Sequence, residues 1–454
     1  MRVEESITRS GEFFTLANPA KKYFGTLSIS DGGLINVEIY SDSAEFIKYD
    51  EPQLGRLIGK VERGYVTLEG CTFQKMGFGH GLPARSVIVA TQALLGKGFE
   101  EENPLYAEYF FSVDCLDEWL MRPGMKITYG DRHNQATLTF DKPEPLSFLL
   151  HDGTQVSLDF NVTTPTSQSY PETSIFQKAF FSLRAPEPQS IEFYRSLSHK
   201  ITRLMSFLVG YSLNIHSVHG VAISAHRNQP GQLIEIYYPS MHLNPFRRLR
   251  SDEMMLSFKS IAERFGQLLA NWVESYDVLT PALHHFFAVQ DASHKYQDTR
   301  FLAMAQGLET FHRRTAPSET QMEPSDFQAM VTRILKSCGE EDANWLEGRL
   351  IYGNELTLLK RLNQLIAPFQ ELFGTKRDCA YIVRKTVETR NYFTHFDKRL
   401  EAKALNGSKL VYVIYRLRVL FIFNILFHLG FTTDEIIRLG DQPYLKRMRQ
   451  VGKL

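Results

Sequence analysis

The chain has 454 residues, of which 43% are hydrophobic, and it is rich in aromatic side chains, with 33 Phe and 20 Tyr. This composition excludes an intrinsically disordered protein and is typical of a globular chain of about two to four domains. The formal charge is zero, because 51 Lys and Arg balance 51 Asp and Glu.

Residues 1–183 are predicted to form a β-rich N-terminal domain. Short runs of alternating or β-branched residues are separated there by Gly, Pro, Asn and Asp. These runs are residues 25–29, 35–40, 86–90 and 136–140. The segment Asp31-Gly32-Gly33 between the first two runs is typical of a hairpin turn. We therefore expect an antiparallel sheet or sandwich with little helix, for instance at 114–121.

Residues 184–292 are predicted to form a mixed, mainly helical middle region. Apolar residues recur at helical spacing over residues 191–214, and strand-like runs follow at 220–224 and 233–238. From residue 252 onward the periodicity is almost wholly helical. The helical segments are residues 252–275, 279–290, 297–314, 324–337, 355–372, 378–395, 403–429 and 432–439.

Residues 293–454 are therefore expected to form an all-α C-terminal domain, which makes the fold class α+β. This domain ends in a basic region, because residues 380–454 contain 14 Lys and Arg against 6 Asp and Glu. Such a charge imbalance indicates an end that binds a polyanion such as RNA. An ordinary solvated basic surface explains the same count equally well.

The sequence predicts a cytoplasmic protein without a membrane span. The N-terminus, MRVEESITRSGEFF, has acidic residues and no apolar signal-peptide segment. The longest apolar stretch, residues 411–431, contains Arg416 and Arg418 and is expected to be a buried helix. The four cysteines are scattered, as in reduced proteins.

No metal and no cofactor are predicted. The cysteines lack metal-finger spacing, and the pairs His284-His285 and His216 with His219 have no third ligand at a suitable spacing.

The segment Arg390-Asn391-Tyr392-Phe393-Thr394-His395 is the strongest candidate for a catalytic site. His transfers protons near neutral pH, and Arg stabilises charge on a phosphate with a planar fork of donors. On a regular helix, however, residues five apart point about 140° away from each other. Either the helix is frayed or bulged here, or the two groups meet those of a second chain. A solvated Arg and a helix-end His are the alternative.

The same segment is similar to the R-x4-6-H motif of HEPN ribonucleases, in which a polar residue, often Asn, follows the Arg, as Asn391 does here. The helical segment before it and the apolar segment 410–429 after it resemble a HEPN helical bundle. Residues 301–313 resemble the first helix of ApeA-like HEPN domains. Residues 11–14, 25–27 and 31–33 resemble the N-terminal domain of that family.

This resemblance implies a bacterial antiphage protein whose C-terminal domain is a metal-independent endoribonuclease, with RNA as substrate and tRNA as one candidate. It implies a homodimer formed through the HEPN domains, with the two motifs facing each other. His395 would take the proton from the attacking 2′-hydroxyl, Arg390 would hold the phosphate, and Asn391 would orient the motif. Glu309 in the first helix either braces Arg390 or lies on a solvated face.

Several further expectations accompany this resemblance. The basic residues around the motif are predicted to bind RNA, namely Arg384, Lys385, Lys398 and Arg399. Residues 1–183 are expected to sense a phage protein as the trigger. The alternative is a catalytically silent HEPN bundle that serves as a dimerisation or RNA-binding adaptor, and nucleotide transfer is also known among HEPN proteins.

Overall fold

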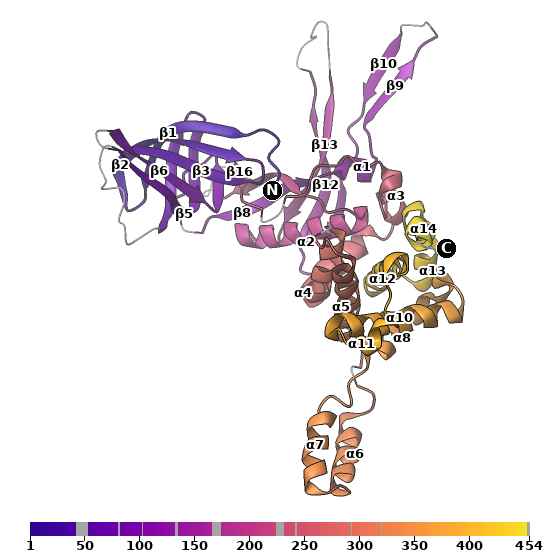
Figure 1. The fold of residues 1–454 in the computed structure, drawn as a ribbon. Helices are drawn as coiled ribbons and strands as arrows, with labels where there is room; N and C mark the ends of the chain where they lie inside the picture. Colours follow the sequence, from indigo (N-terminus) through magenta and orange to yellow (C-terminus); the bar gives the residue numbers. More distant parts are fainter. Residues whose placement is uncertain are drawn as a thin grey trace. The chain divides into compact units, whose positions relative to one another are not determined.

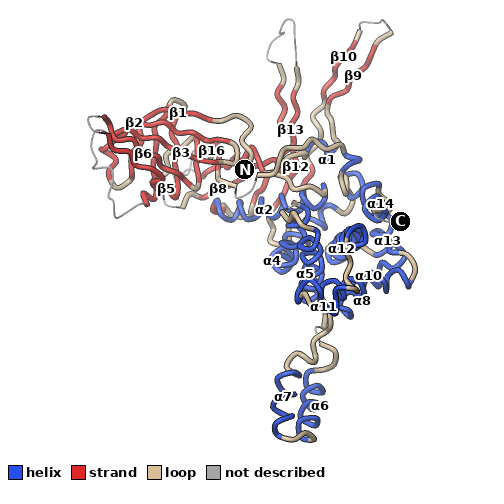
Figure 2. The backbone as a smooth tube through the Cα atoms, viewed as in Figure 1, coloured by secondary structure: helices blue, strands red, loops and turns tan. Residues whose placement is uncertain are grey.

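The computed structural model describes residues 1–41, 53–79, 82–101, 103–131, 135–165, 174–223, 231–240, 243–291, 293–318 and 320–451. The chain divides into two compact units, Met1–Val273 and Glu274–Leu454. Figure 2 shows strands in the first unit and helices throughout the second, so the predicted α+β class is confirmed. The three-part division at residues 183/184 and 292/293 stays a prediction.

The first unit is built on a fourteen-stranded sheet. Its strands are β1 (Ile7–Thr15), β2 (Asn18–Ser30), β3 (Leu34–Ser41), β4 (Gln53–Val61), β5 (Gly64–Gly79), β6 (Leu82–Ala90), β7 (Gln92–Leu95), β8 (Leu105–Val113), β11 (Leu146–Leu149), β12 (Gln155–Thr163), β13 (Phe176–Arg184), β14 (Gln189–Ser190), β15 (Ile215–Ala222) and β16 (Gln232–Tyr237). Strands β9 (Met125–Tyr129) and β10 (Ala136–Phe140) form a separate antiparallel pair.

Six of these strands close into an antiparallel barrel, in the order β5-β4-β1-β2-β3-β6, because β6 pairs with both β3 and β5 (Figure 1). Alternate side chains point inward, as the period of two requires, and Phe13, Leu27 and Val37 are completely buried. Phe13 needs the space that Gly59 leaves, since a Cβ atom at Gly59 would lie 2.5 Å from its ring.

The remaining strands extend the sheet beyond the barrel in the order β7-β16-β15-β8-β13-β12-β11. Strands β15 and β16 come from the predicted middle region, yet they pair with β8 and β7 of the β-rich front. Helices α1 (Leu116–Leu120) and α2 (Ile191–Val209) lie beside these strands. Tyr194 of α2 stacks on Tyr109 of β8, with ring centroids 5.5 Å apart.

Two short helical pieces, η2 (Ser251–Glu253) and α3 (Phe258–Ile261), precede α4 (Phe265–Gln290). The predicted break between residues 275 and 279 is wrong, because α4 continues through Pro281. An interior proline costs about 3 kcal/mol. Burial of the residues around it, Leu279, Leu283 and Phe286, offsets that cost.

The helices of the second unit after α4 are α5 (Gln297–Thr315), α6 (Pro324–Lys336), α7 (Glu340–Leu350), α8 (Leu358–Ile366), η3 (Ala367–Phe369), α9 (Gln370–Phe373), α10 (Lys376–His395), α11 (Lys398–Glu401), α12 (Gly407–His428), α13 (Thr433–Gly440) and α14 (Pro443–Gln450). Helices α7, α11 and α14 lie outside the predicted helical segments. In α7 no residue is buried, so it lacks the apolar periodicity that reveals a helix in a sequence.

Helix α12 is the central helix of this unit. Its length, and the mean hydropathy of 1.9 over its most apolar 18 residues, would suit a membrane span, but 72% of those residues are buried within the structure, as in a core helix. Phe421 at its centre packs edge-on against Phe286 and Phe311, with ring centroids 5.4 and 5.7 Å apart. Gly307 of α5 permits this close approach, because a Cβ atom there would lie 2.7 Å from Phe421.

Buried His216 of β15 should make the first unit sensitive to acid. Its pKa is lowered from 6.5 to about 4, chiefly by burial and further by Lys178, while Asp114 and Glu4 oppose the shift. The unfolded chain therefore binds a proton below pH 6.5 that the folded chain does not bind until about pH 4. The free energy of unfolding should fall by about 3 kcal/mol across that window.

We predict that His216→Gln flattens this fall. Denaturant unfolding of the wild type and the variant, measured at pH 7 and pH 4.5, would check it. An equal loss of stability in both chains would assign the acid sensitivity to other groups.

Candidate functional site

The candidate site lies at the C-terminal end of α10. The helix begins with a capping box, in which Thr375 Oγ accepts from Asp378 N–H and the Asp378 carboxylate accepts from Thr375 N–H. Its buried face includes Ile382 and Val383. It ends at Phe396, whose left-handed backbone (φ 49°) directs its N–H to the Tyr392 carbonyl oxygen, 2.6 Å away.

The helix is regular through the whole motif, so the predicted alternative of a frayed or bulged helix does not apply. Within that regular turn, Thr394 Oγ donates a hydrogen bond to the Arg390 carbonyl oxygen, 2.7 Å away. On a regular helix the side chains of Arg390 and His395 leave the axis about 140° apart. The two side chains therefore leave one copy of α10 in different directions.

Arg390 is held by an acidic side chain of another helix. Its guanidinium lies 3.6 Å from the carboxylate of Glu309 on α5 and donates to the Asn391 side-chain oxygen at 3.4 Å. Its side chain is 29% exposed, and that of Glu309 is 19% exposed. Of the two readings of Glu309, the structure shows the brace.

Glu309 belongs to a larger charged network that joins α5 to the segment before α8. Arg313, one helical turn after Glu309, lies 3.4 Å from its carboxylate and 2.8 Å from that of Glu355. These carboxylates raise the pKa of Arg313, with Glu355 as the larger cause. The Arg390 guanidinium is thus fixed at one edge of a network of alternating charges.

His395 is exposed at the last position of α10. Asp397 follows two residues later, and its pKa lies below the usual range because Arg399 hydrogen-bonds to it and because His395 is close by. The Arg399 guanidinium contacts this carboxylate at 2.7 Å. His395 therefore remains open to solvent, with a carboxylate nearby that is already bound to an arginine.

The four basic residues predicted to bind RNA differ in their surroundings. Arg384 and Lys398 are exposed. Lys385 is engaged within the protein, since its ammonium lies 2.7 Å from Glu388 and donates to the Lys403 carbonyl oxygen at 2.9 Å. Arg399 is exposed but paired with Asp397. Their role in RNA binding stays a prediction for all four.

A buried polar contact that the sequence did not reveal holds α5 against α8. Arg361 of α8 is completely buried and donates to the Leu356 carbonyl oxygen at 3.0 Å. Its guanidinium also lies 3.1 Å from Nδ1 of the buried His312 on α5. Because α5 carries Glu309, this contact fixes the helix that braces Arg390. An isolated Arg and an isolated His gave no sequence signal for it.

No group of three or more His, Cys, Asp and Glu side chains is arranged to hold a metal ion within the part of the chain that the structure describes. The four cysteines, Cys71, Cys115, Cys338 and Cys379, are free thiols.

A helical bundle that carries an Arg and a His at the end of one helix is the arrangement of a HEPN domain. In agreement, the family described as Apea-like HEPN matches residues 302–435, and the family described as ApeA N-terminal domain 1 matches residues 8–272. The second match covers more than half of the chain, so the protein belongs to the ApeA family, a family of antiphage HEPN nucleases. No curated protein and no solved structure matches the chain.

Proposed function

We propose that this protein is a metal-independent endoribonuclease that cleaves RNA, with tRNA as a candidate substrate, through Arg390 and His395. The observation that carries the proposal is that Arg390 is held by an ion pair while His395 is open to solvent. Arg390 is braced by Glu309 at 3.6 Å and partly exposed, whereas His395 is exposed on the next turn. A bundle that served only as a scaffold would need neither group.

The proposed reaction is an attack of the ribose 2′-hydroxyl on the adjacent phosphate. His395 takes the proton from the 2′-oxygen, the bond from that oxygen to phosphorus forms, and the bond from phosphorus to the 5′-oxygen breaks. The leaving 5′-oxygen receives a proton from His395 of the partner subunit or from water. Arg390 stabilises the charge on the phosphate, and the products carry a 2′,3′-cyclic phosphate and a 5′-hydroxyl.

The helix geometry supports a homodimer with a composite site. Because α10 is regular through His395, its own Arg390 and His395 point about 140° apart. A two-fold axis beside the end of α10 would bring the motif of each chain to face that of the other. Each phosphate would then meet Arg390 of one chain and His395 of the other.

This composite site predicts recovery of activity in mixed dimers. Chains with Arg390→Ala and chains with His395→Ala should each be inactive alone. Mixed in equal amounts and allowed to exchange, they should recover up to about a quarter of the wild-type cleavage rate when water protonates the leaving oxygen, since half of the dimers are mixed and each holds one site with both Arg390 and His395. Cleavage of a labelled RNA measures this, and a mixture as inactive as its components would place the site within one chain.

Glu309 is proposed as a positioning residue for Arg390. Glu309→Gln should lower the cleavage rate about tenfold, because displacing a catalytic group by about 1 Å can cost up to about 100-fold. Glu355→Gln is the matched control, since Glu355 contacts Arg313 but Arg390 pairs with Glu309. Steady-state cleavage by both variants measures the difference, and equal losses in the two would contradict the positioning role.

The β-rich first unit is proposed to receive the activating signal from a phage protein, which rests on membership of the ApeA family. Cleavage by the purified full chain, measured with and without extract from phage-infected cells, tests this idea. Stimulation by infected extract supports it, whereas equal rates with infected and uninfected extract would remove it.

A further inference from the structure

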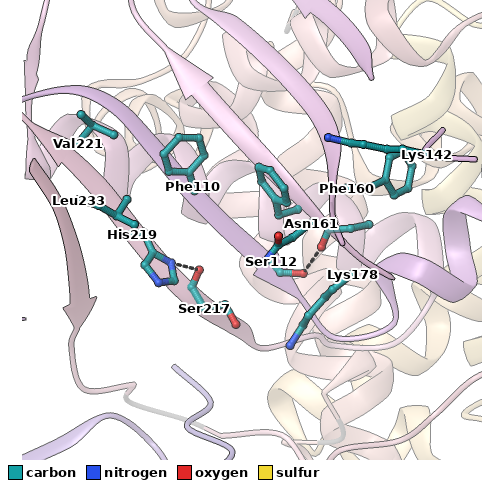
Figure 3. A pocket seen from close by; sticks show the side chains of 12 residues that line it. Phe110, Ser112, Lys142, Phe160, Asn161, Lys178, Ser217, His219, Val221 and Leu233 are labelled. Atoms are coloured by element: carbon teal, nitrogen blue, oxygen red, sulfur yellow. Dashed lines mark hydrogen bonds between the residues drawn. The ribbon is translucent and has the colours of Figure 1, made fainter. Parts of the chain in front are cut away.

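A cavity on the outward face of the sheet in the first unit has no part in the proposed nuclease site. It has a volume of about 630 Å³. Residues of β8, β12, β13, β15 and β16 line it, together with Lys142 from the loop between β10 and β11 (Figure 3). Pockets for small molecules commonly have volumes of about 300–1,000 Å³ and a mainly apolar lining with a few polar groups. The cavity therefore has the size of a small-molecule site.

Its floor is aromatic. Phe110 of β8 and Phe180 of β13 lie on adjacent strands and meet edge to face, with ring centroids 5.8 Å apart. Both rings are only partly buried, whereas Phe160 of β12 is buried. Half-exposed rings on a sheet surface offer a platform on which a flat ring can stack.

The ionisable groups that line the cavity are basic. Lys142, Lys178 and His219 contribute to the lining, and none of the described lining residues is Asp or Glu. Lys142 lies 2.9 Å from Asp159, and Lys178 lies 3.3 Å from Glu4. All four of these charged side chains are at least 29% exposed, and ion pairs of that kind are weak. Both lysines therefore remain available to an anion.

The backbone of β15 is distorted at the cavity. The register of β15 on β8 shifts between His216 and His219, and Ser217 within this bulge has a left-handed backbone, with φ of 51°. His219 Nδ1 bonds to the Ser217 carbonyl oxygen at 3.0 Å (Figure 3). Bulges of this kind redirect side chains and are frequent beside functional sites. Here the bulge places Ser217 and His219 together in the lining.

We propose that this cavity binds a mononucleotide, that is, a ligand with one flat base and a phosphate. The base stacks on the face of Phe180 and meets the edge of Phe110, since the two rings lie 76° apart, and the positive charges of Lys142 and Lys178 attract the phosphate. A longer nucleic acid fits less well, because carboxylates flank the cavity. Glu108, paired with Arg184, lines a neighbouring cavity that shares both rings, and exposed Glu235 lies two residues after Leu233 on β16. These carboxylates would repel the phosphates of neighbouring nucleotides.

The test is calorimetric titration of the full chain with AMP, GMP, CMP and UMP. At least one should bind with a dissociation constant below about 1 mM, and its nucleoside and ribose 5-phosphate should each bind at least about tenfold more weakly. The same titration with the His395→Ala and Arg390→Ala chains should give unchanged affinity, which separates this site from the nuclease motif. Absence of binding by all four mononucleotides would overturn the proposal.

Matched variants locate the site. Phe180→Ala should weaken binding at least about tenfold, whereas Phe176→Ala, on the same strand, 65% exposed and outside the lining, should not. Lys142→Gln should also weaken binding, unlike Lys22→Gln, which alters an exposed lysine paired with Glu12 at 3.0 Å. The comparison of Lys142→Gln with Lys22→Gln tests the site even if Phe180→Ala fails to fold. Equal affinities in all four variants, or tighter binding of a ten-nucleotide RNA that depends on Phe180, would overturn the proposal.

Discussion

His395→Ala should lower the rate of RNA cleavage by about 10²–10⁴-fold, because it removes the group that transfers the proton. Arg390→Ala should have an effect of about 10²–10³-fold by removing charge stabilisation at the phosphate. The fold should tolerate both changes, since His395 is exposed and Arg390 lies at the edge of its network with 29% of its side chain exposed. Single-turnover cleavage of a labelled RNA measures both effects.

Lys376→Ala provides a control for the loss of a positive charge on the same helix. Lys376 is the first residue of α10, at the opposite end from the motif, and it is exposed. Its replacement should leave the cleavage rate nearly unchanged. Full activity in the His395→Ala and Arg390→Ala chains would assign the reaction to other residues.

Phe421→Ala should destabilise the helical unit by about 3–5 kcal/mol, the usual cost of deleting a buried Phe. Phe421 is completely buried on α12 and contacts Phe286 and Phe311. The ring also lies against Gly307. Because Gly307 has no side chain, it cannot fill the cavity that Phe421→Ala would leave. Denaturant unfolding followed by circular dichroism measures the change in the free energy of unfolding.

The matched control is Phe427→Ala on the same helix. Phe427 is 48% exposed and contacts Phe369 with ring centroids 6.0 Å apart. Its replacement should cost about 1 kcal/mol, because surface substitutions remove little buried area. Similar losses of stability in both variants would contradict the central place of Phe421 in the core.

Local patterns predicted most of the helices because their signals lie close together in the sequence. Helix α10 has its cap at Thr375 and Asp378, and α12 is a long apolar segment. The closure of the barrel was not predictable in this way, because the pairing of β3 with β6 and of β1 with β4 joins strands that lie far apart in the sequence. The predicted break before Pro281 was wrong, because burial of the residues along α4 outweighs the tendency of proline to interrupt a helix.

For the candidate site, too, the sequence predicted single residues but not the contacts between distant segments. Arg390 and His395 stand out in the sequence because their chemistry suits phosphate cleavage and their segment resembles a known motif. The sequence left open whether Glu309 pairs with Arg390 or lies on a solvated face, and it gave no indication that Glu355 pairs with Arg313. Both ion pairs join segments that lie far apart in the chain. The outward cavity was also hidden, since Phe110, Phe180 and Lys142 come together only in the folded sheet.

The chemical identity of the RNA ends produced without divalent metal tests most directly whether the protein is a metal-independent ribonuclease that acts through His395. Purified protein would be incubated in EDTA with tRNA and mRNA, alone and with extract from phage-infected cells treated to remove nucleases. We expect cleavage that leaves 2′,3′-cyclic phosphates and 5′-hydroxyls and that disappears in the His395→Ala chain. Cleavage that requires Mg²⁺ and leaves 5′-phosphates, or intact RNA under every condition, would contradict it.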